Sequence, residues 1–157
     1  MTKAIIGKTA PAFNLPSTGE KSVRLSTLKG HNVVVYFYPR DATPGCTTES
    51  QNFRDAIKKF AKTDTLIVGI SQDSIKSHEK FHTKQELNFD LLSDESGETC
   101  RKYGVLKMKN MYGKEFEGIE RSTFLIDRQG VLRAEWRKVK VPGHVDEVLA
   151  AAKDLAN

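Results

Sequence analysis

Residues 31–50 read HNVVVYFYPRDATPGCTTES and contain the transition that decides the fold. Their first eight residues are mostly β-branched or aromatic without polar alternation, which is the pattern of a strand covered on both faces. A polar turn with two prolines follows, and residues 47–62 then place Phe53, Ile57 and Phe60 at helical spacing. The stretch therefore predicts a central strand that leads through a short loop into a helix.

The rest of the chain extends this unit into a complete α/β arrangement. Residues 66–70, LIVGI, are typical of a second buried strand, so strand, helix and strand form a parallel crossover. The further predicted elements are a polar helix over 74–86, a strand over 89–92, a helix over 96–103, two strands over 122–126 and 131–137, and a helix over 145–155. Residues 10–28 fit a small extra hairpin, and 108–118 are read as a loop. This order predicts a thioredoxin-like α/β fold, with a central mixed sheet flanked by helices and an N-terminal β extension, in a single domain over residues 1–157.

Composition and charge exclude several classes of protein. With 38% hydrophobic and 29% charged residues, the chain fits neither a disordered segment nor a coiled coil. The net charge of +5 is spread among 20 acidic residues without an arginine-rich arm, so we expect a solvated surface and no nucleic-acid partner. No apolar run reaches the roughly 18 residues of a membrane span, and the start shows no secretory signal. We therefore expect a cytoplasmic protein that does not associate with membranes.

The two cysteines, Cys46 and Cys100, are too few for a disulfide framework or a thiolate metal site. Any cysteine chemistry should therefore be reactive rather than structural. Cys46 lies in or at the first turn of the predicted helix, where free N–H groups and the helix dipole stabilise a thiolate. Since the thiolate is the nucleophilic form, Cys46 is the candidate for attack.

Side chains around Cys46 extend this interpretation. Thr43 can direct a hydroxyl toward the sulfur or a bound oxygen, Pro39 can shield the loop, and Gly45 lets backbone amides approach a ligand. Glu49 lies one turn after Cys46 and would repel a thiolate, so we expect it to pair with an arginine. Taken singly, each residue also fits a structural role: a turn, a helix cap or an acid in a first helical turn.

The spacing Pro-x3-Thr-x2-Cys directly after a VVVYFY strand resembles the active-site signature of the peroxiredoxins. The resemblance extends through GKTAPAFNLP, YFYPRDATPGCTTE, LIVGISQDS, FDLLSDE and RSTFLID, which together span nearly the whole chain. The TPGCT form and the compact length resemble the bacterioferritin comigratory protein subfamily, also called peroxiredoxin Q. This resemblance implies a thiol-dependent peroxidase that reduces hydrogen peroxide and organic hydroperoxides.

The resemblance also implies a role for each site residue. Cys46 would be the peroxidatic cysteine, Thr43 the hydroxyl that bonds peroxide and thiolate, and Pro39 the shield of the pocket. Arg121, before Ser-Thr-Phe, would stabilise the thiolate and the peroxide oxygens, and Glu49 would hold it in place. Attack on the peroxide bond would leave a sulfenic acid on Cys46 and release water or an alcohol.

Several alternatives stay open beside this reading. Without the resemblance, Arg121 would be read as forming a surface ion pair with Glu120 or Glu117. His78 and His82 are four residues apart, a spacing that can chelate zinc, but we expect exposed helix positions and no metal or other cofactor. A thioredoxin-type disulfide oxidoreductase is disfavoured because Glu49 stands where Cys-x-x-Cys needs its second cysteine. A cysteine hydrolase is disfavoured because no histidine is predicted near the thiol, and an inactive binding protein of the same fold is the non-enzymatic alternative.

The chain departs from the subfamily in the step that recovers the thiol. Gln51 and His82 stand where related chains carry a resolving cysteine, and only Cys100 remains, expected to be half-buried beneath Tyr103 and Val105. We therefore predict a one-cysteine cycle completed by an external thiol, with thioredoxin or glutathione and glutaredoxin as candidate reductants. The resemblance favours a monomer, with a dimer as the alternative.

Overall fold

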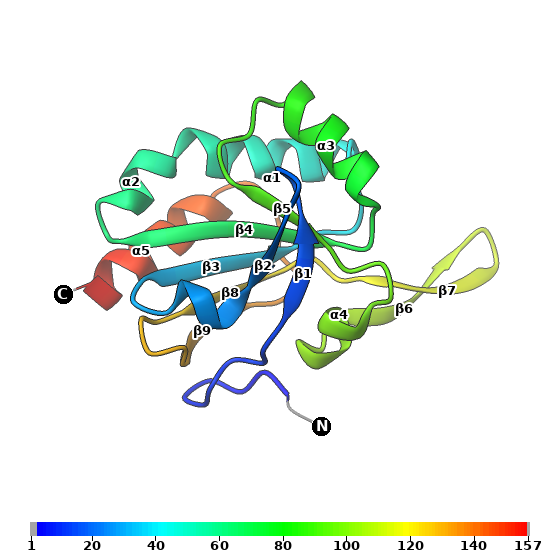
Figure 1. Cartoon of the computed structure of the whole chain (residues 1–157). Helices are drawn as coiled ribbons and strands as arrows, with labels where there is room; N and C mark the ends of the chain where they lie inside the picture. Colours follow the sequence, from blue (N-terminus) through cyan, green and yellow to red (C-terminus); the bar gives the residue numbers. More distant parts are fainter. Residues whose placement is uncertain (1–2, 157) are drawn as a thin grey trace.

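A computed structural model describes residues 3–156 of the chain (Figure 1). Seven strands form one sheet in the order β2-β1-β5-β4-β3-β8-β9, and two more form a separate hairpin, β6-β7. The elements are β1 (Asn14–Ser17), β2 (Lys21–Arg24), the short 3-10 helix η1 (Leu25–Leu28), β3 (Asn32–Phe37), α1 (Pro44–Asp55), α2 (Ile57–Ala61), β4 (Thr65–Ser71), α3 (Ile75–Lys84), β5 (Asp90–Ser93), α4 (Glu98–Lys102), β6 (Leu106–Met111), β7 (Lys114–Ile119), β8 (Ser122–Ile126), β9 (Leu132–Trp136) and α5 (His144–Ala156).

Strand β3 lies at the centre of the sheet, as its apolar sequence predicts. All six of its residues are buried. It pairs with β4 in parallel and with β8 in antiparallel orientation, so the sheet is mixed. The predicted mixed sheet flanked by helices is therefore confirmed.

The two faces of β3 belong to two different hydrophobic cores because successive side chains of a strand point to opposite faces. Val35 and Phe37 face a core closed by the N-terminal segment and α4. Val34 and Tyr36 face the other core, which α1, α2, α3 and α5 cover (Figure 1). Among residues 3–156, no helix is both long enough and apolar enough to cross a membrane.

The N-terminal β extension is also confirmed. Strands β1 and β2 form an antiparallel hairpin, with Leu15 opposite Val23. The hairpin joins the main sheet through one pairing, between Ser17 on β1 and Leu92 on β5. Phe13 precedes the hairpin and Leu25 follows it, and both side chains enter the core beneath the sheet.

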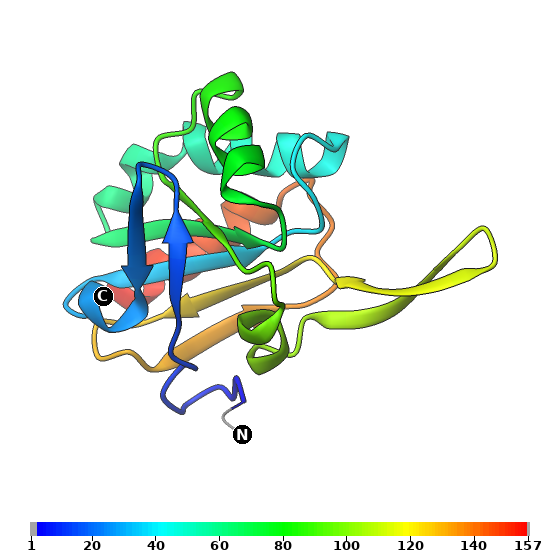
Figure 2. The same ribbon diagram turned by 45° about the vertical axis from the view of Figure 1, so that its right-hand side comes forward.

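Two predictions of local structure were wrong. The single helix expected over residues 47–62 is two helices, which meet at Ala56, and the first begins at Pro44. Residues 108–118, read as a loop, belong to the β6-β7 hairpin, which projects from the body of the molecule (Figure 2). Its turn residues Tyr112 and Gly113 both have positive φ, at 54° and 78°, as the tight hairpin turns that match strand twist require.

Candidate active site

Cys46 occupies the first turn of α1, directly beyond the carboxyl end of the central strand. Thr43 is the N-cap residue, and Pro44 occupies the first turn, where its missing N–H costs no hydrogen bond. Cys46 is fully buried. The helix N-terminus presents free N–H groups and partial positive charge on this side, which favours a negatively charged sulfur.

Arg121 bridges Cys46 and Glu49. Its Nη2 donates to the Cys46 Sγ at 3.4 Å, and its Nη1 donates to the Glu49 Oε1 at 2.7 Å. The Glu49 side chain is 0% exposed and the Arg121 side chain 16% exposed, so the pair is largely shielded from water. The alternative pairing of Arg121 with Glu117 or Glu120 is wrong, since Glu117 pairs with Arg101 instead. One guanidinium therefore faces both acidic groups, although it lies 75 residues from the cysteine along the chain.

Burial and the neighbouring Arg121 act in opposite directions on the pKa of the Glu49 carboxyl. Burial raises its pKa from 4.5 to about 7, although the charge and hydrogen bond of Arg121 act in the opposite direction. Its second oxygen, Oε2, is buried without a hydrogen-bond partner among the described residues. Burial also opposes the charge on Arg121, but Glu49 and Cys46 raise the pKa of Arg121 above its usual value. The arginine is therefore held charged while the carboxyl titrates near neutral pH.

Gly45 leaves the space that the guanidinium occupies. A Cβ at this position would lie 3.0 Å from the Arg121 Nη2, closer than nearly all ordinary contacts of a Cβ. The lack of a side chain at Gly45 therefore lets the Arg121 side chain approach the start of α1 closely. This role is additional to the close approach of a ligand that was expected from the sequence.

Thr43 and Pro39 lie in the loop that precedes α1. Both are half-buried. The Thr43 Oγ1 donates to the Arg40 carbonyl at 2.8 Å, so its proton is used by the backbone and its lone pairs remain as acceptors. Within residues 3–156 no hydrogen bond joins this hydroxyl to Cys46. The structure therefore brings Cys46, Glu49 and Arg121 together through hydrogen bonds, and places Thr43 and Pro39 in the adjoining loop.

Lys109 is a second cation of this region that sequence reasoning missed. It lies on β6, and its Nζ donates to the Ile119 carbonyl at 2.6 Å. Burial and the neighbouring charge of Arg121 lower the Lys109 pKa, while the Cys46 sulfur acts to raise it. The strand that carries Lys109 begins with the alternation Leu106-Lys107-Met108-Lys109, which together with the Tyr-Gly pair of the hairpin turn is the sequence signal for this element.

The histidines differ from their expected positions. His78 is buried, contrary to the exposed position expected for it, and His82 is half-buried. His144 bonds the Thr123 hydroxyl through Nε2 at 2.8 Å, and burial together with the charge of Arg121 lowers its pKa to about 4. In the part of the chain that the structure describes, no hydrogen bond joins a histidine to Cys46, and the Sγ accepts from Arg121 instead.

Cys100 lies in a different core from Cys46. It is fully buried rather than half-buried, and packs with Tyr103 and Val105 on the face of the sheet opposite to Cys46. Burial raises the pKa of the Cys100 thiol far above its usual value, and Asp94 adds to the effect. The central sheet therefore separates the two thiols.

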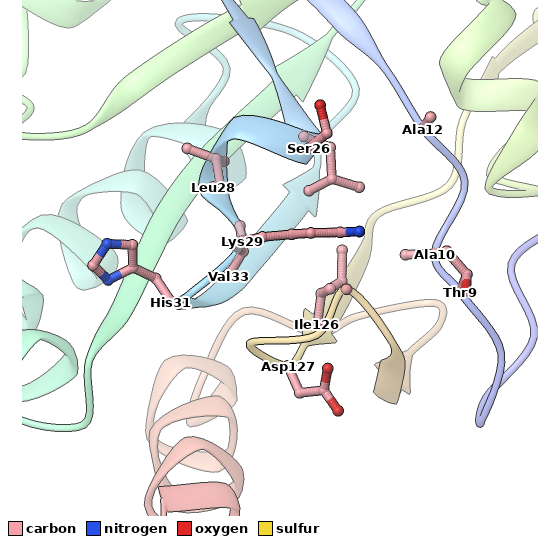
Figure 3. Close-up of a pocket in the computed structure, with 12 residues that line it drawn as sticks. Thr9, Ala10, Ala12, Ser26, Leu28, Lys29, His31, Val33, Ile126 and Asp127 are labelled. Atoms are coloured by element: carbon pink, nitrogen blue, oxygen red, sulfur yellow. The ribbon is translucent and has the colours of Figure 1, made fainter.

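A pocket of about 140 Å³ lies at the other end of the sheet (Figure 3). Its wall includes Val33 and Ile126, which are paired at the far end of β3 and β8 from the residues that lead into α1. The side chain of Lys29 extends across it (Figure 3). The pocket is mostly apolar and contains neither cysteine, so it is separate from the Cys46 site.

Comparison with known proteins gives one consistent result. Residues 6–135 match the model of the AhpC/TSA family. The chain is 49% identical to peroxiredoxin Bcp of Bacillus subtilis over 96% of both proteins. Among solved structures it resembles a cysteine-to-serine variant of PrxQ from Xylella fastidiosa, with a TM-score of 0.93, 38% identity and full coverage of both chains. It also resembles the Xanthomonas campestris bacterioferritin comigratory protein, studied for alkyl peroxide reduction, with a TM-score of 0.88, 48% identity and 92% coverage of each chain.

Proposed function

The chain belongs to the AhpC/TSA family, with the Bcp and PrxQ peroxiredoxins as relatives, and on that premise we propose that Cys46 reduces hydroperoxides in a one-cysteine cycle. The protein is a thiol-dependent peroxidase with the thioredoxin-like fold expected from its sequence. Its substrates in this proposal are hydrogen peroxide and organic hydroperoxides. The observation that carries the proposal is the Arg121 guanidinium, which faces the buried sulfur and a buried carboxyl at the same time.

The first step is attack of the Cys46 thiolate on one peroxide oxygen. An S–O bond forms as the O–O bond breaks, and the departing oxygen leaves with the electron pair and takes up a proton as water or an alcohol. The sulfur is oxidised to a sulfenic acid and the peroxide is reduced by two electrons. Negative charge moves from sulfur to oxygen, so a fixed cation beside both atoms stabilises the transition state without reorganising.

Each of the other site residues has a part in this proposal. Glu49 holds the Arg121 guanidinium through a 2.7 Å hydrogen bond, which fixes the direction of its remaining donors. Pro39 shields the loop from water, and the Thr43 oxygen accepts a hydrogen bond from a protonated peroxide oxygen. The low polarity around a fully buried sulfur strengthens these interactions.

The second step requires a thiol from another molecule. Cys100 is on the opposite face of the sheet, and its raised pKa keeps it protonated and unreactive. Gln51 has no thiol and instead donates to the Gln85 side chain at 2.8 Å. An external thiolate attacks the sulfenic sulfur and releases water, and a second thiol then breaks the mixed disulfide. We propose thioredoxin or glutathione with glutaredoxin as the source, in the cytoplasm, with the protein acting as a monomer or dimer.

Turnover assays with each reductant test this proposal. Peroxide consumption is measured with thioredoxin and its reductase, and separately with glutathione, glutaredoxin and glutathione reductase. We expect Cys100→Ser to turn over like the parent with the productive system, and Cys46→Ser to consume no peroxide. If Cys46→Ser matched the parent, the peroxidase assignment of Cys46 would be refuted, and loss of turnover in Cys100→Ser would refute the one-cysteine cycle.

A further inference from the structure

Asp41 is a buried carboxylate within the loop that carries Pro39 and Thr43, and three donors converge on it. The Tyr38 hydroxyl donates to Oδ1 at 2.7 Å, and the Ser77 hydroxyl donates to Oδ2 at 2.8 Å. The His78 Nδ1 lies 2.7 Å from the same Oδ2. Ser77 and His78 are on α3, so these contacts join the loop before Cys46 to a helix that is separated from it along the chain by α1, α2 and β4 (Figure 1).

The hydrogen-bond partners of His78 indicate its protonation state. Its Nε2 lies 2.9 Å from the Leu92 carbonyl, which can only accept, so Nε2 carries a proton. Burial raises the pKa of Asp41, but the hydrogen bond and charge of His78, with the hydroxyls of Tyr38 and Ser77, lower it. Both Asp41 oxygens accept a hydroxyl proton, from Tyr38 and from Ser77, so the Nδ1 that faces Oδ2 is the donor of the third contact. Asp41 and His78 form an imidazolium–carboxylate pair with side-chain exposures of 4% and 0%.

The backbone of the loop is anchored at the same point. The Asp41 N–H donates to the Asp73 Oδ2 at 2.8 Å, and that carboxylate also accepts from the Ser71 hydroxyl at 2.6 Å. The next residue, Ala42, has φ of 65°, a left-handed conformation that is unfavourable for a residue with a side chain. Such strain persists only where surrounding contacts hold it, and here the Asp41 contacts lie on one side and the start of α1 on the other.

We propose that the Asp41–His78 pair is a positioning device of the peroxidase, which fixes the upstream end of the Cys46 loop on α3 and β5 and sets how readily that loop opens. The proposal rests on the function of Cys46 argued above. Peroxide attack needs the loop closed, because the helix start, Pro39 and Arg121 act together only in that arrangement. Reaction of the sulfenic acid with an external thiol needs the loop open, because the Cys46 sulfur is fully buried and such a thiol is bulkier than a peroxide.

The pair therefore has opposite effects on the two half-reactions. Weakening it lets the strained Ala42 backbone relax, which misplaces the catalytic groups and slows peroxide attack. The same change exposes the sulfenic acid and speeds its reaction with an external thiol. A residue that only stabilised the fold would not separate the two rates in this way.

The test uses single-turnover kinetics of His78→Gln and Asp41→Asn in the full chain. The rate of Cys46 oxidation by hydrogen peroxide and the rate of sulfenic acid reaction with a small thiol are measured separately. We expect oxidation to slow by about tenfold to a hundredfold, the scale of a small misplacement of catalytic groups. We expect the reaction of the sulfenic acid with the thiol to accelerate several-fold in each single variant. The double variant should show an acceleration of about the same size, because both substitutions break the same pair.

His31→Gln is the matched control, because His31 and Asp64 form a similar pair at 2.6 Å on the exposed surface. It should leave both rates unchanged. Rates that fall together in the pair variants, or that do not change, would overturn the positioning role. Failure of the peroxidase proposal itself would appear differently, as absence of Cys46 oxidation in the unmodified protein.

A measurement on the unmodified protein covers the case in which a variant does not fold. Nitrogen-15 NMR of the His78 ring should show protons on both nitrogens at neutral pH, as the pair requires. A neutral ring with an unprotonated Nδ1 would overturn the proposal, whatever the behaviour of the variants.

Discussion

Glu49→Gln removes a buried carboxyl that titrates near neutral pH while preserving its size and its ability to accept from Arg121. The pKa of Glu49 is raised from 4.5 to about 7, and burial is the largest cause. The folded state therefore binds a proton more tightly than the unfolded state between these two values. We expect this substitution to change how the stability of the protein depends on pH.

The direction and size of the effect follow from linkage. Because the folded pKa is raised, the stability contributed by proton binding is fully present below pH 4.5 and is lost as the pH rises through about 7. A shift of this size corresponds to about 3 kcal/mol. Glutamine has no proton to lose, so the variant lacks this term. The unfolding free energy of the parent should fall relative to that of the variant by about 2 to 3 kcal/mol between pH 5 and pH 8.

Urea unfolding at a series of pH values measures this difference. Both proteins should carry Cys46→Ser, so that oxidation and titration of the thiol do not contribute. Other titrating groups are common to both proteins and cancel in the comparison. A difference in unfolding free energy that stays constant from pH 5 to pH 8 would show that Glu49 does not titrate as its burial implies, and the electrostatic account of the site would be wrong.

Three further substitutions probe the cation side of the site through the rate of Cys46 oxidation by hydrogen peroxide. Arg121→Lys loses the fork that bridges two acidic groups and should lower the rate about a hundredfold, and a rate within twofold of the parent would contradict the bridging role. Gly45→Ala places a Cβ 3.0 Å from the Arg121 Nη2 and should slow oxidation about threefold to tenfold with the circular dichroism spectrum unchanged, whereas an unchanged rate would mean that the guanidinium position is unimportant. Lys109→Met should slow oxidation about twofold to fivefold at low salt. The control is Lys114→Met, at an exposed position of the same hairpin, which should leave the rate unchanged. Equal effects of the two substitutions would rule out a local role for Lys109.

The central part of the fold was predictable because the apolar pattern is strong there. The chain has no polar residue between Val33 and Phe37 in strand β3, and Pro39 and Pro44 mark where the strand ends and the helix begins. The β6-β7 hairpin was not predictable in this way. Most of its side chains are exposed and Ile119 is the buried one, so the core constrains only the end of the hairpin nearest the body of the molecule.

The site was predictable in its chemistry but only partly in its contacts. The need for a cation near Cys46 and Glu49 could be inferred from charge, and the identity of that cation as Arg121 came from the resemblance. The burial of His78 had a sequence signal, since it falls three residues after Ile75 and three before Phe81 on the apolar face of the helix. Its pairing with Asp41 depends on how α3 packs against the loop, which no local pattern specifies.

The most direct test of the account is the fate of Cys46 after one equivalent of hydrogen peroxide in the absence of added thiol. Intact-mass spectrometry with a reagent that traps sulfenic acids should find one oxidised sulfur per chain, at Cys46, with Cys100 still a free thiol. A Cys46–Cys100 disulfide, or trapping at Cys100, would contradict the separation of the two thiols by the sheet and with it the one-cysteine cycle.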